Sequence, residues 1–221
     1  PKALLAAIII VSVSGLFKYA EMKVMYEQNK REFYILMATF GITLLLGVQA
    51  GLFVGVGLSI VMVIYNTANP HMTELGTIQE GRLYRNVDRF KEAEVRPDVL
   101  VFRFDAPLYF ANKDYFVTKL YGWMKQRKTD DLKYVVFDAE AVNSVDSTGI
   151  LMLQQLIENF RQQGIEFYIT NAIGPVRDAL KTSSLRDFMC EQTMFSTIAD
   201  AIAFIDKGVN QHAQAALQTN R

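Results

Sequence analysis

The feature that most constrains this chain is a run of 41 residues, Phe33 to Thr73, that contains no Asp, Glu, Lys or Arg. Residues 1–66 carry eight charged side chains in all, whereas the remaining 155 residues carry 38. The second value is close to the one in four that is typical of soluble domains. The 51% apolar content therefore averages a membrane segment with a water-soluble one. This excludes a single soluble globule, and the formal charge of +0 gives no reason to expect a nucleic acid as partner.

The apolar run is too long for one membrane helix. As a helix, residues 33–65 would extend about 50 Å, against a hydrocarbon core of about 30 Å. Gly47, Gln49 and Gly51 supply a break, so we expect two short spans that are tilted or packed inside a bundle. A third apolar stretch near the start is typical of the end of a further span rather than of a signal peptide. The expected spans within residues 1–66 are 3–17, 33–46 and 52–65.

The segment Lys18–Glu32 between the first two spans carries four basic residues against three acidic ones, and basic residues in short loops favour the cytoplasmic side of a membrane. Two more crossings return the chain to that side, so everything after Asn66 is expected in the cytoplasm. We therefore predict a multi-pass protein of the cell (inner) membrane, with the lipid bilayer as its first partner.

Gly47, Gly51 and Gly55 recur every four residues, a spacing that lets a neighbouring helix approach closely. Helix packing is the favoured interpretation, and an ion path is the alternative. The spans contain no ionisable side chain, which is the usual marker of a substrate or proton site inside a membrane. We therefore expect any transport chemistry to lie elsewhere.

The second part of the chain alternates strands with helices. This order predicts an α/β domain with a mixed, mostly parallel sheet covered by helices. We expect a linker at 67–86 with a possible short strand at Leu75–Gln79, a domain at 87–207, and a disordered, Gln-rich tail at 208–221. The predicted strands are 99–104, 134–137 and 165–170, and the predicted helices are 114–124, 147–161, 175–182 and 198–205.

Three short motifs carry a resemblance to a known family. They are the run Phe104–Asn112, the strand end Val136–Asp138, and Asn143–Gly149, which opens a helix. Together they resemble the STAS domain of sulfate permease (SulP) family anion transporters. The segment Glu32–Pro70 is similar to the last two spans of the same family, so the resemblance covers nearly the whole chain.

The resemblance implies a function for the parent protein. The chain would be the C-terminal part of a secondary active transporter of sulfate, bicarbonate or a related anion, with no cofactor. Its partners would be the missing N-terminal spans of the same protein, a second copy in a homodimer, and a cytosolic regulatory protein. The family's anion site is formed by earlier spans, so no substrate-binding residue is expected in this chain.

Asp146, Ser147 and Thr148 form the sharpest local feature, at the start of a predicted helix. Three interpretations remain open: a helix cap, a regulatory phosphorylation site, and an anion or nucleotide site at the helix N-terminus. The second follows from the resemblance, because anti-sigma-factor antagonists with this fold are phosphorylated at the matching serine, Ser147. A membrane-tethered partner-switch module regulated at Ser147 is therefore the alternative function.

Catalysis has no obvious residues in this sequence. Asp105 and Asp138 are expected to be turn carboxylates, and neither the two isolated histidines, His71 and His212, nor Cys190 forms a metal or nucleophile motif. We therefore predict no catalytic residue, no metal site and no enzyme. Within the run Pro107–Phe110, burial of Leu108 and Phe110 with Tyr109 at an edge is the favoured interpretation. The alternative is an exposed contact patch toward the membrane helices or a second subunit.

Overall fold

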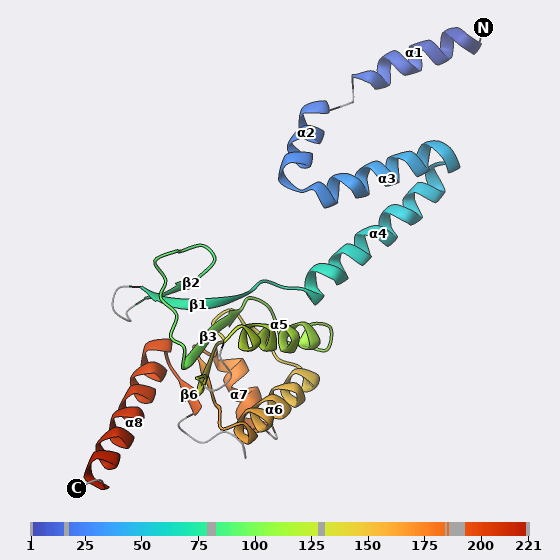
Figure 1. Ribbon diagram of the computed structural model, residues 1–221. Helices are drawn as coiled ribbons and strands as arrows, with labels where there is room; N and C mark the ends of the chain where they lie inside the picture. The colour runs from blue at the N-terminus through green and yellow to red at the C-terminus, as the bar shows by residue number, and fades with distance from the viewer. Residues whose placement is uncertain are drawn as a thin grey trace. The chain divides into compact units, whose positions relative to one another are not determined.

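The computed structural model describes residues 2–15, 18–78, 83–127, 131–183, 185 and 193–219, with side chains described as far as residue 208. The chain divides into two compact units, Pro1–Tyr65 and Asn66–Arg221. The first consists of helices, and the second contains a sheet with helices on both faces (Figure 1).

Four helices account for the first unit: α1 (Lys2–Ser14), α2 (Tyr19–Gln28), α3 (Lys30–Leu46) and α4 (Val48–Ala68), whose last turn belongs to the second unit. Among the residues of these helices that the structure describes, Gly51 alone is buried. Exposed apolar surface on this scale requires lipid or further protein around it.

Helix α4 is long and apolar enough to cross a membrane by itself. Helices α1 and α2, bent by 50°, pass the same test as one broken span, so the described residues hold one such helix or up to two. Helix α3 has 17 residues and is therefore about 26 Å long, slightly short of a hydrocarbon core of about 30 Å.

The helix boundaries differ from the expected spans. The break is confined to Gly47, which has a φ of +92° and lets α4 begin at the next residue. The two helices are therefore longer than the expected 33–46 and 52–65. Helix α1 ends at Ser14, and the rest of the span expected at 3–17 lies partly outside the described residues. The segment 18–32, expected as a connection, contains α2.

The second unit is organised around a six-stranded sheet of order β2-β1-β3-β4-β5-β6. Strand β1 pairs antiparallel with both β2 and β3, whereas β3, β4, β5 and β6 are parallel to one another. The mixed, mostly parallel sheet predicted from the sequence is confirmed. The strands are β1 (Met72–Ile78), β2 (Leu83–Asn86), β3 (Val99–Phe104), β4 (Tyr134–Asp138), β5 (Glu166–Thr170) and β6 (Met194–Phe195).

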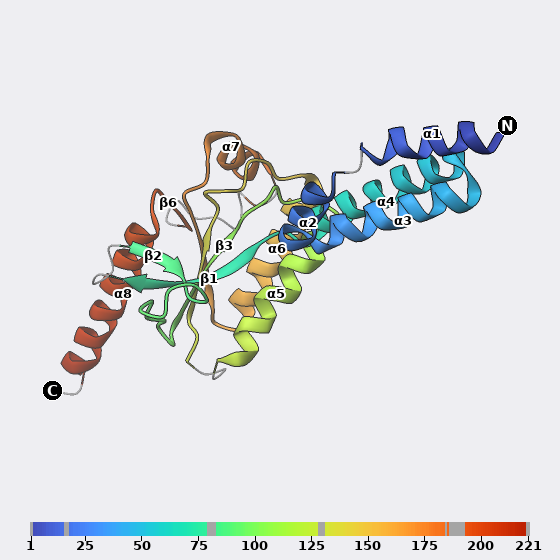
Figure 2. The same cartoon turned by 90° about the horizontal axis from the view of Figure 1, so that it is seen from above.

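Helices cover the sheet on both faces, which explains the nearly continuous apolar sequence of the central strands. One face packs against α5 (Lys113–Gln126), α6 (Ser147–Gln162) and α7 (Gly174–Thr182), and the other packs against α8 (Ile198–Thr219) (Figure 2). On the first face the ring of Phe102 stacks on that of Phe137 at 5.1 Å and meets Phe116 edge-on at 5.5 Å. On the second face Ala201 and Ile205 are buried beside Val136.

The tail differs from expectation, and the linker does so in part, since the possible strand at Leu75–Gln79 is present as β1. Residues 72–78 and 83–86 are strands of the sheet, because pairing of β1 with β3 buries Met72, Thr73 and Leu75. Residues 208–219 continue α8 as a helix, where disorder was expected. Alanine, glutamine and leucine, which dominate this stretch, are good helix formers.

Candidate functional site

The chemistry-bearing residues of the second unit gather where the parallel strands end. Asp105 follows β3, Asp138 ends β4 and Asn171 follows β5, and parallel strands present their carboxyl ends at one edge of a sheet. Helix α6 begins at Ser147, after the loop that leaves β4. This edge of the sheet is the candidate site, and its polar residues differ in the contacts that they make.

Asp146 is the N-cap of α6. Its Oδ1 accepts hydrogen bonds from the backbone N–H of Gly149 and from the Thr148 hydroxyl, both at 2.7 Å. Its Oδ2 accepts the backbone N–H of Phe110 at 3.0 Å, so the same carboxylate also holds the loop after β3. Partial burial acts to raise the pKa of Asp146, but these hydrogen bonds outweigh it and lower the pKa.

Ser147 occupies the first helical position of α6 and is exposed. Its hydroxyl forms no hydrogen bond to any residue that the structure describes. Thr148, in contrast, is held by Asp146. The hydrogen bonds of Asp146 therefore explain the helix cap, and the Ser147 hydroxyl remains accessible to solvent.

Gly149 is required by the close approach of the loop after β3. A Cβ atom there would lie 2.9 Å from the Leu108 carbonyl oxygen and 3.1 Å from Val145 Cγ1. Leu108 and Val145 form an isolated parallel bridge, so the two loops run side by side. Any larger residue at position 149 would push the loops apart.

The run Pro107–Phe110 is only partly as expected. Leu108 is fully buried, as predicted, but Phe110 is 67% exposed, so its predicted burial is wrong. The bridge with Val145 turns Leu108 into the core, and Phe110 lies two residues further on in a turn, where its N–H is used by Asp146. Tyr109 is half-buried and its ring meets that of Phe110 edge-on at 5.4 Å.

Asp105 is the centre of a charged cluster. Arg103 Nε donates to its Oδ1 at 2.6 Å, and His71 Nδ1 lies 2.7 Å from its Oδ2. Burial by itself would raise the pKa of Asp105, but the bonds from Arg103 and His71 outweigh it and lower the pKa. His71 also accepts the Asp105 N–H through its backbone carbonyl at 3.0 Å, which fastens the segment before β1 to the loop after β3.

Asp138 is buried, with 2% of its surface exposed. Its Oδ1 accepts a hydrogen bond from Asn171 Nδ2 at 2.8 Å and one from the Glu140 N–H at 3.3 Å. Burial dominates and raises the pKa of Asp138. Among the described residues no three His, Cys, Asp or Glu side chains stand close enough together to hold a metal ion, so Asp105, Asp138 and Asp146 do not form such a site.

The three glycines at four-residue spacing, Gly47, Gly51 and Gly55, lie at the α3–α4 hairpin. A Cβ on Gly51 would lie within 3 Å of the Thr43 side chain, and one on Gly55 would lie 2.9 Å from Thr39 Cγ2, so both glycines face α3. Gly47 instead forms the turn between the helices. Cys190 lies outside the described residues, and so does the side chain of His212.

A comparison with protein families identifies the family to which this α/β domain belongs. A model of the STAS domain matches residues 90–201, just over half of the chain. The chain belongs to the STAS domain family. The sequence-based resemblance and the α/β fold that it implied are thereby confirmed.

Curated relatives extend the match to the helical unit. The chain is 30% identical to the chloroplastic sulfate transporter 4.1 of Arabidopsis thaliana over 91% of its own length and 31% of that protein. It is also 30% identical to the probable sulfate transporter 4.2 of the same plant, over 96% of this chain and 32% of the relative. The chain thus spans about a third of the length of the curated relatives it matches.

A solved structure shows the same fold. The murine Slc26a9 anion transporter in the inward-facing state matches 94% of this chain and 34% of its own, with a TM-score of 0.78 and 24% identity. The matched 94% of this chain includes both its helices and its STAS domain, so the two units follow each other in the same order along both chains.

One important residue of the STAS domain was not found by sequence reasoning. Asn112 is fully buried; its Oδ1 accepts the Tyr109 N–H at 3.0 Å, and its Nδ2 donates to the carbonyls of Pro107 at 2.8 Å and Thr67 at 3.4 Å. It therefore fixes the loop after β3 and ties it to the end of α4. An asparagine just before a predicted helix was the signal, but its partner 45 residues away was not visible.

Proposed function

We propose that this chain is the C-terminal part of a secondary active transporter of a small inorganic anion of the sulfate or bicarbonate type. The observation that supports this is the match of more than nine tenths of the chain, helices included, to proteins named sulfate transporters. A STAS domain alone would match over its own residues. Here the apolar helices and the α/β domain match together and in the same order.

In this proposal the anion site lies outside the 221 residues. Helices α3 and α4 carry no Asp, Glu, Lys or Arg between Phe33 and Ala68, which leaves no charged group there to bind an anion. Helices α3 and α4 would serve as scaffold or gate, and the STAS domain would support folding, dimer formation and regulation. A transporter rather than an enzyme is also what the relatives favour.

The proposed location is the cell membrane, with several spans in the parent protein and the STAS domain in the cytoplasm. The basic residues of 18–31 support this orientation, since short cytoplasmic loops are rich in Lys and Arg. The STAS domain follows α4 after three residues, and Arg31 at the start of α3 stacks on Tyr65 near the end of α4 at 5.2 Å. The positive segment and the exit of the chain therefore share one end of the hairpin.

The proposal is tested by transport measurements on two proteins. The protein encoded by the whole reading frame, reconstituted in liposomes, should accumulate radiolabelled sulfate or bicarbonate, whereas residues 1–221 alone should not. A reading frame that holds several hundred further residues with apolar segments before Pro1 would support the proposal. Robust uptake by residues 1–221 alone would contradict the placement of the anion site.

A second candidate is a membrane-tethered partner-switch module controlled at Ser147, and the exposed hydroxyl of Ser147 favours it. A phosphate there would add about −1.5 to −2 charges at the N-terminus of α6. Intact-mass analysis of protein isolated from cells tests this candidate, with Ser147→Ala as the control. A start codon directly before Pro1 together with a modified Ser147 would favour the module over the transporter.

A further inference from the structure

Helix α2 differs from its neighbours in the first unit. It has none of their strongly apolar character: Lys23, Glu21 and Glu27 lie within its ten residues, and no residue of it is buried. Its two cap residues, Lys18 and Asn29, are polar as well. A short polar helix between apolar ones belongs at the boundary between lipid and water rather than inside the bilayer.

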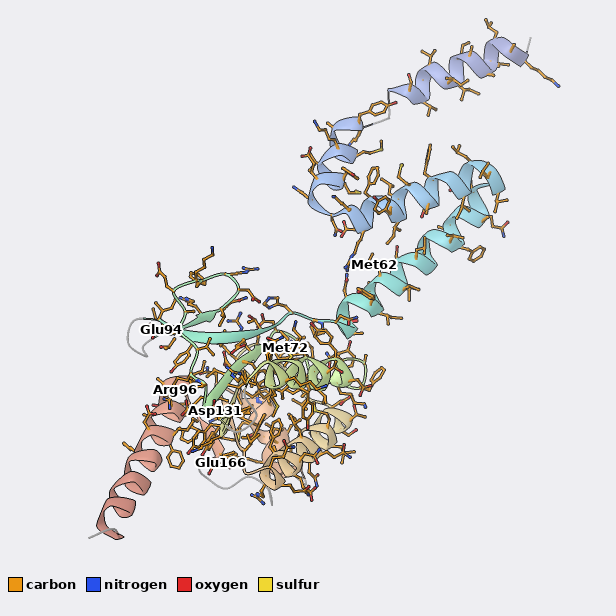
Figure 3. The ribbon with its side chains drawn as sticks, viewed as in Figure 1. Met62, Met72, Glu94, Arg96, Asp131 and Glu166 are labelled. Atoms are coloured by element: carbon orange, nitrogen blue, oxygen red, sulfur yellow. The ribbon has the colours of Figure 1, made fainter. Side chains whose placement is uncertain are left out.

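The position of that boundary follows from contacts at the ends of α3 and α4. Arg31 stacks on the ring of Tyr65, which lies three residues before the end of α4, the helix that is long enough to cross a membrane. Helix α2 joins α3 directly through Asn29, whose side chain accepts the Glu32 N–H at 3.5 Å and donates to Glu32 Oε1 at 2.8 Å. The α2–α3 corner therefore lies at the same end of the α3–α4 hairpin as the C-terminal part of α4 (Figure 3).

The two sides of α2 differ in charge. Tyr19, Lys23 and Tyr26 follow one another at helical spacings of four and three residues and share one side. Lys30 lies over the Tyr26 ring at 5.6 Å, and that ring also packs edge-on against Phe33 at 5.1 Å. The side chains of Tyr19 and Tyr26 are 70% and 42% exposed.

The opposite side of α2 lines a hollow of about 380 Å³ together with the start of α3. The acidic residues Glu21 and Glu32 both belong to that hollow, and Glu21 is also paired with Lys18 at 2.7 Å. Glu27 is the acidic residue of α2 that remains outside it. Glu27 follows Lys23 by four residues and lies on the lysine–tyrosine side. With Lys30 included, that side therefore has two lysines and one carboxylate, whereas the side at the hollow has two carboxylates.

We propose that the side of α2 formed by Tyr19, Lys23 and Tyr26, extended by Lys30 of α3, binds the headgroups of anionic phospholipids. The ammonium groups complement the phosphate charge, and tyrosine rings are favoured at the depth of the headgroups. Lys23 and Lys30 carry the interaction, and the tyrosines set its depth. The proposal rests on the membrane location under the proposed function, but not on anion transport.

The test measures which lipids remain bound to residues 1–221. The protein is purified in mixed micelles that contain equal amounts of phosphatidylglycerol and phosphatidylcholine, and native mass spectrometry gives the ratio of the two bound lipids. A lysine near an anionic surface contributes about 1 kcal/mol, or about fivefold in binding. We expect a preference for phosphatidylglycerol that falls by about fivefold for each of Lys23→Gln and Lys30→Gln.

One set of control variants removes a lysine charge from the STAS domain, and the other keeps the positive charge at positions 23 and 30. Lys125→Gln and Lys181→Gln remove the same charge from exposed sites of the STAS domain and should leave the preference unchanged. Lys23→Arg with Lys30→Arg should retain it. The proposal is overturned if the parent chain shows no preference, if the STAS variants lose it equally, or if excess inorganic phosphate abolishes it. A chain that needs no detergent at all would overturn the membrane location instead.

Discussion

A single carboxylate, Asp146, connects the two loops of the candidate site. It accepts hydrogen bonds from Gly149 and Thr148 in α6 and from Phe110 in the loop after β3. Loss of an N-cap typically costs about 1 kcal/mol. We expect Asp146→Ala to lower the free energy of unfolding by at least that amount, because Phe110 loses its partner as well.

This prediction is checked by urea unfolding of the whole chain in detergent, followed by the fluorescence of Trp123, the single tryptophan. Asp146→Asn keeps an acceptor oxygen and should cost less. Asp114→Ala, at an exposed position in the first turn of α5, is the control and should change stability by no more than about 0.5 kcal/mol. Equal losses in Asp146→Ala and Asp114→Ala would show that the cap contributes nothing specific.

Asp138 is a carboxylic acid whose ionisation opposes folding, because burial raises its pKa above the value in the unfolded chain. Its contribution is therefore most favourable when it is protonated, and stability is lost as the pH rises from the unfolded pKa through the folded one. Asp138→Asn removes this ionisation and keeps Oδ1, the atom that accepts from Asn171 and Glu140.

We expect the stability of Asp138→Asn relative to the parent chain to increase as the pH rises from about 4 towards neutrality. Urea midpoints measured over this range check the prediction. A difference between the two proteins that does not change with pH would mean that Asp138 has the same pKa in the folded and unfolded chains.

At this scale the sequence placed the carboxylates at the ends of secondary-structure elements but did not show whether they come together. The strand–helix alternation placed Asp105, Asp138 and Asp146 at the ends of strands and at a helix start, and the cap at Asp146 followed from residue type. The exposure of Phe110 was missed because it depends on the bridge between Leu108 and Val145, which are 37 positions apart in the chain. Side-chain direction in a loop is set by such distant pairings.

At the scale of elements, the hairpin of α3 and α4 depends on the absence of side chains at two positions of α4. A Cβ on Gly51 would fall within 3 Å of Thr43, including its Cα, whereas a Cβ on Gly57 would meet nothing within 4 Å. We expect Gly51→Ala to destabilise the helical unit by about 1–3 kcal/mol, in the range of overpacked sites. Gly57→Ala should be neutral or slightly stabilising, since alanine favours helix.

The measurement is the thermal stability of the two variants in detergent, compared with the parent chain. Thr43→Ala combined with Gly51→Ala should recover part of the loss, because the hydroxyl that would clash is removed while the Thr43 Cα remains close. If Gly51→Ala and Gly57→Ala behave alike, the close approach of the two helices does not exist in solution.

Long periodic elements were predicted well and short ones were not. Helices α5, α6 and α7 and the central strands lie within a few residues of their predicted positions, because each buries a regular apolar pattern. Helix α2 and strands β2 and β6 have two to ten residues and little apolar periodicity. Strand β1 was read mostly as linker, because Gly76 and Thr77 weaken its apolar pattern.

At the scale of the whole molecule, the STAS domain contains its core within its own residues. Every buried apolar residue of both core clusters lies at or after Met72. The contacts of Thr67 and His71 with the loop after β3 also lie within the second unit. We therefore expect residues 66–221 to fold without the membrane helices and to remain in solution without detergent.

A shorter segment that begins at a different domain boundary provides a matched comparison for residues 66–221. Residues 87–221 begin at the boundary that the sequence predicts, but they lack β1 and β2. Without β1, the edge of β3 is uncovered and Arg127 loses Glu74, its ion-pair partner at 2.5 Å. An open strand edge promotes aggregation. Removal of Glu74 also leaves the mostly buried charge of Arg127 without its partner, which destabilises the domain.

Gel filtration and Trp123 fluorescence of the two segments decide between these boundaries. Residues 66–221 should elute as a folded species with a cooperative urea transition, whereas residues 87–221 should aggregate or unfold without a clear transition. Equal behaviour of both segments would mean that β1 belongs to the connection after all. Aggregation of residues 66–221 alone would mean that the STAS domain depends on the helices before it.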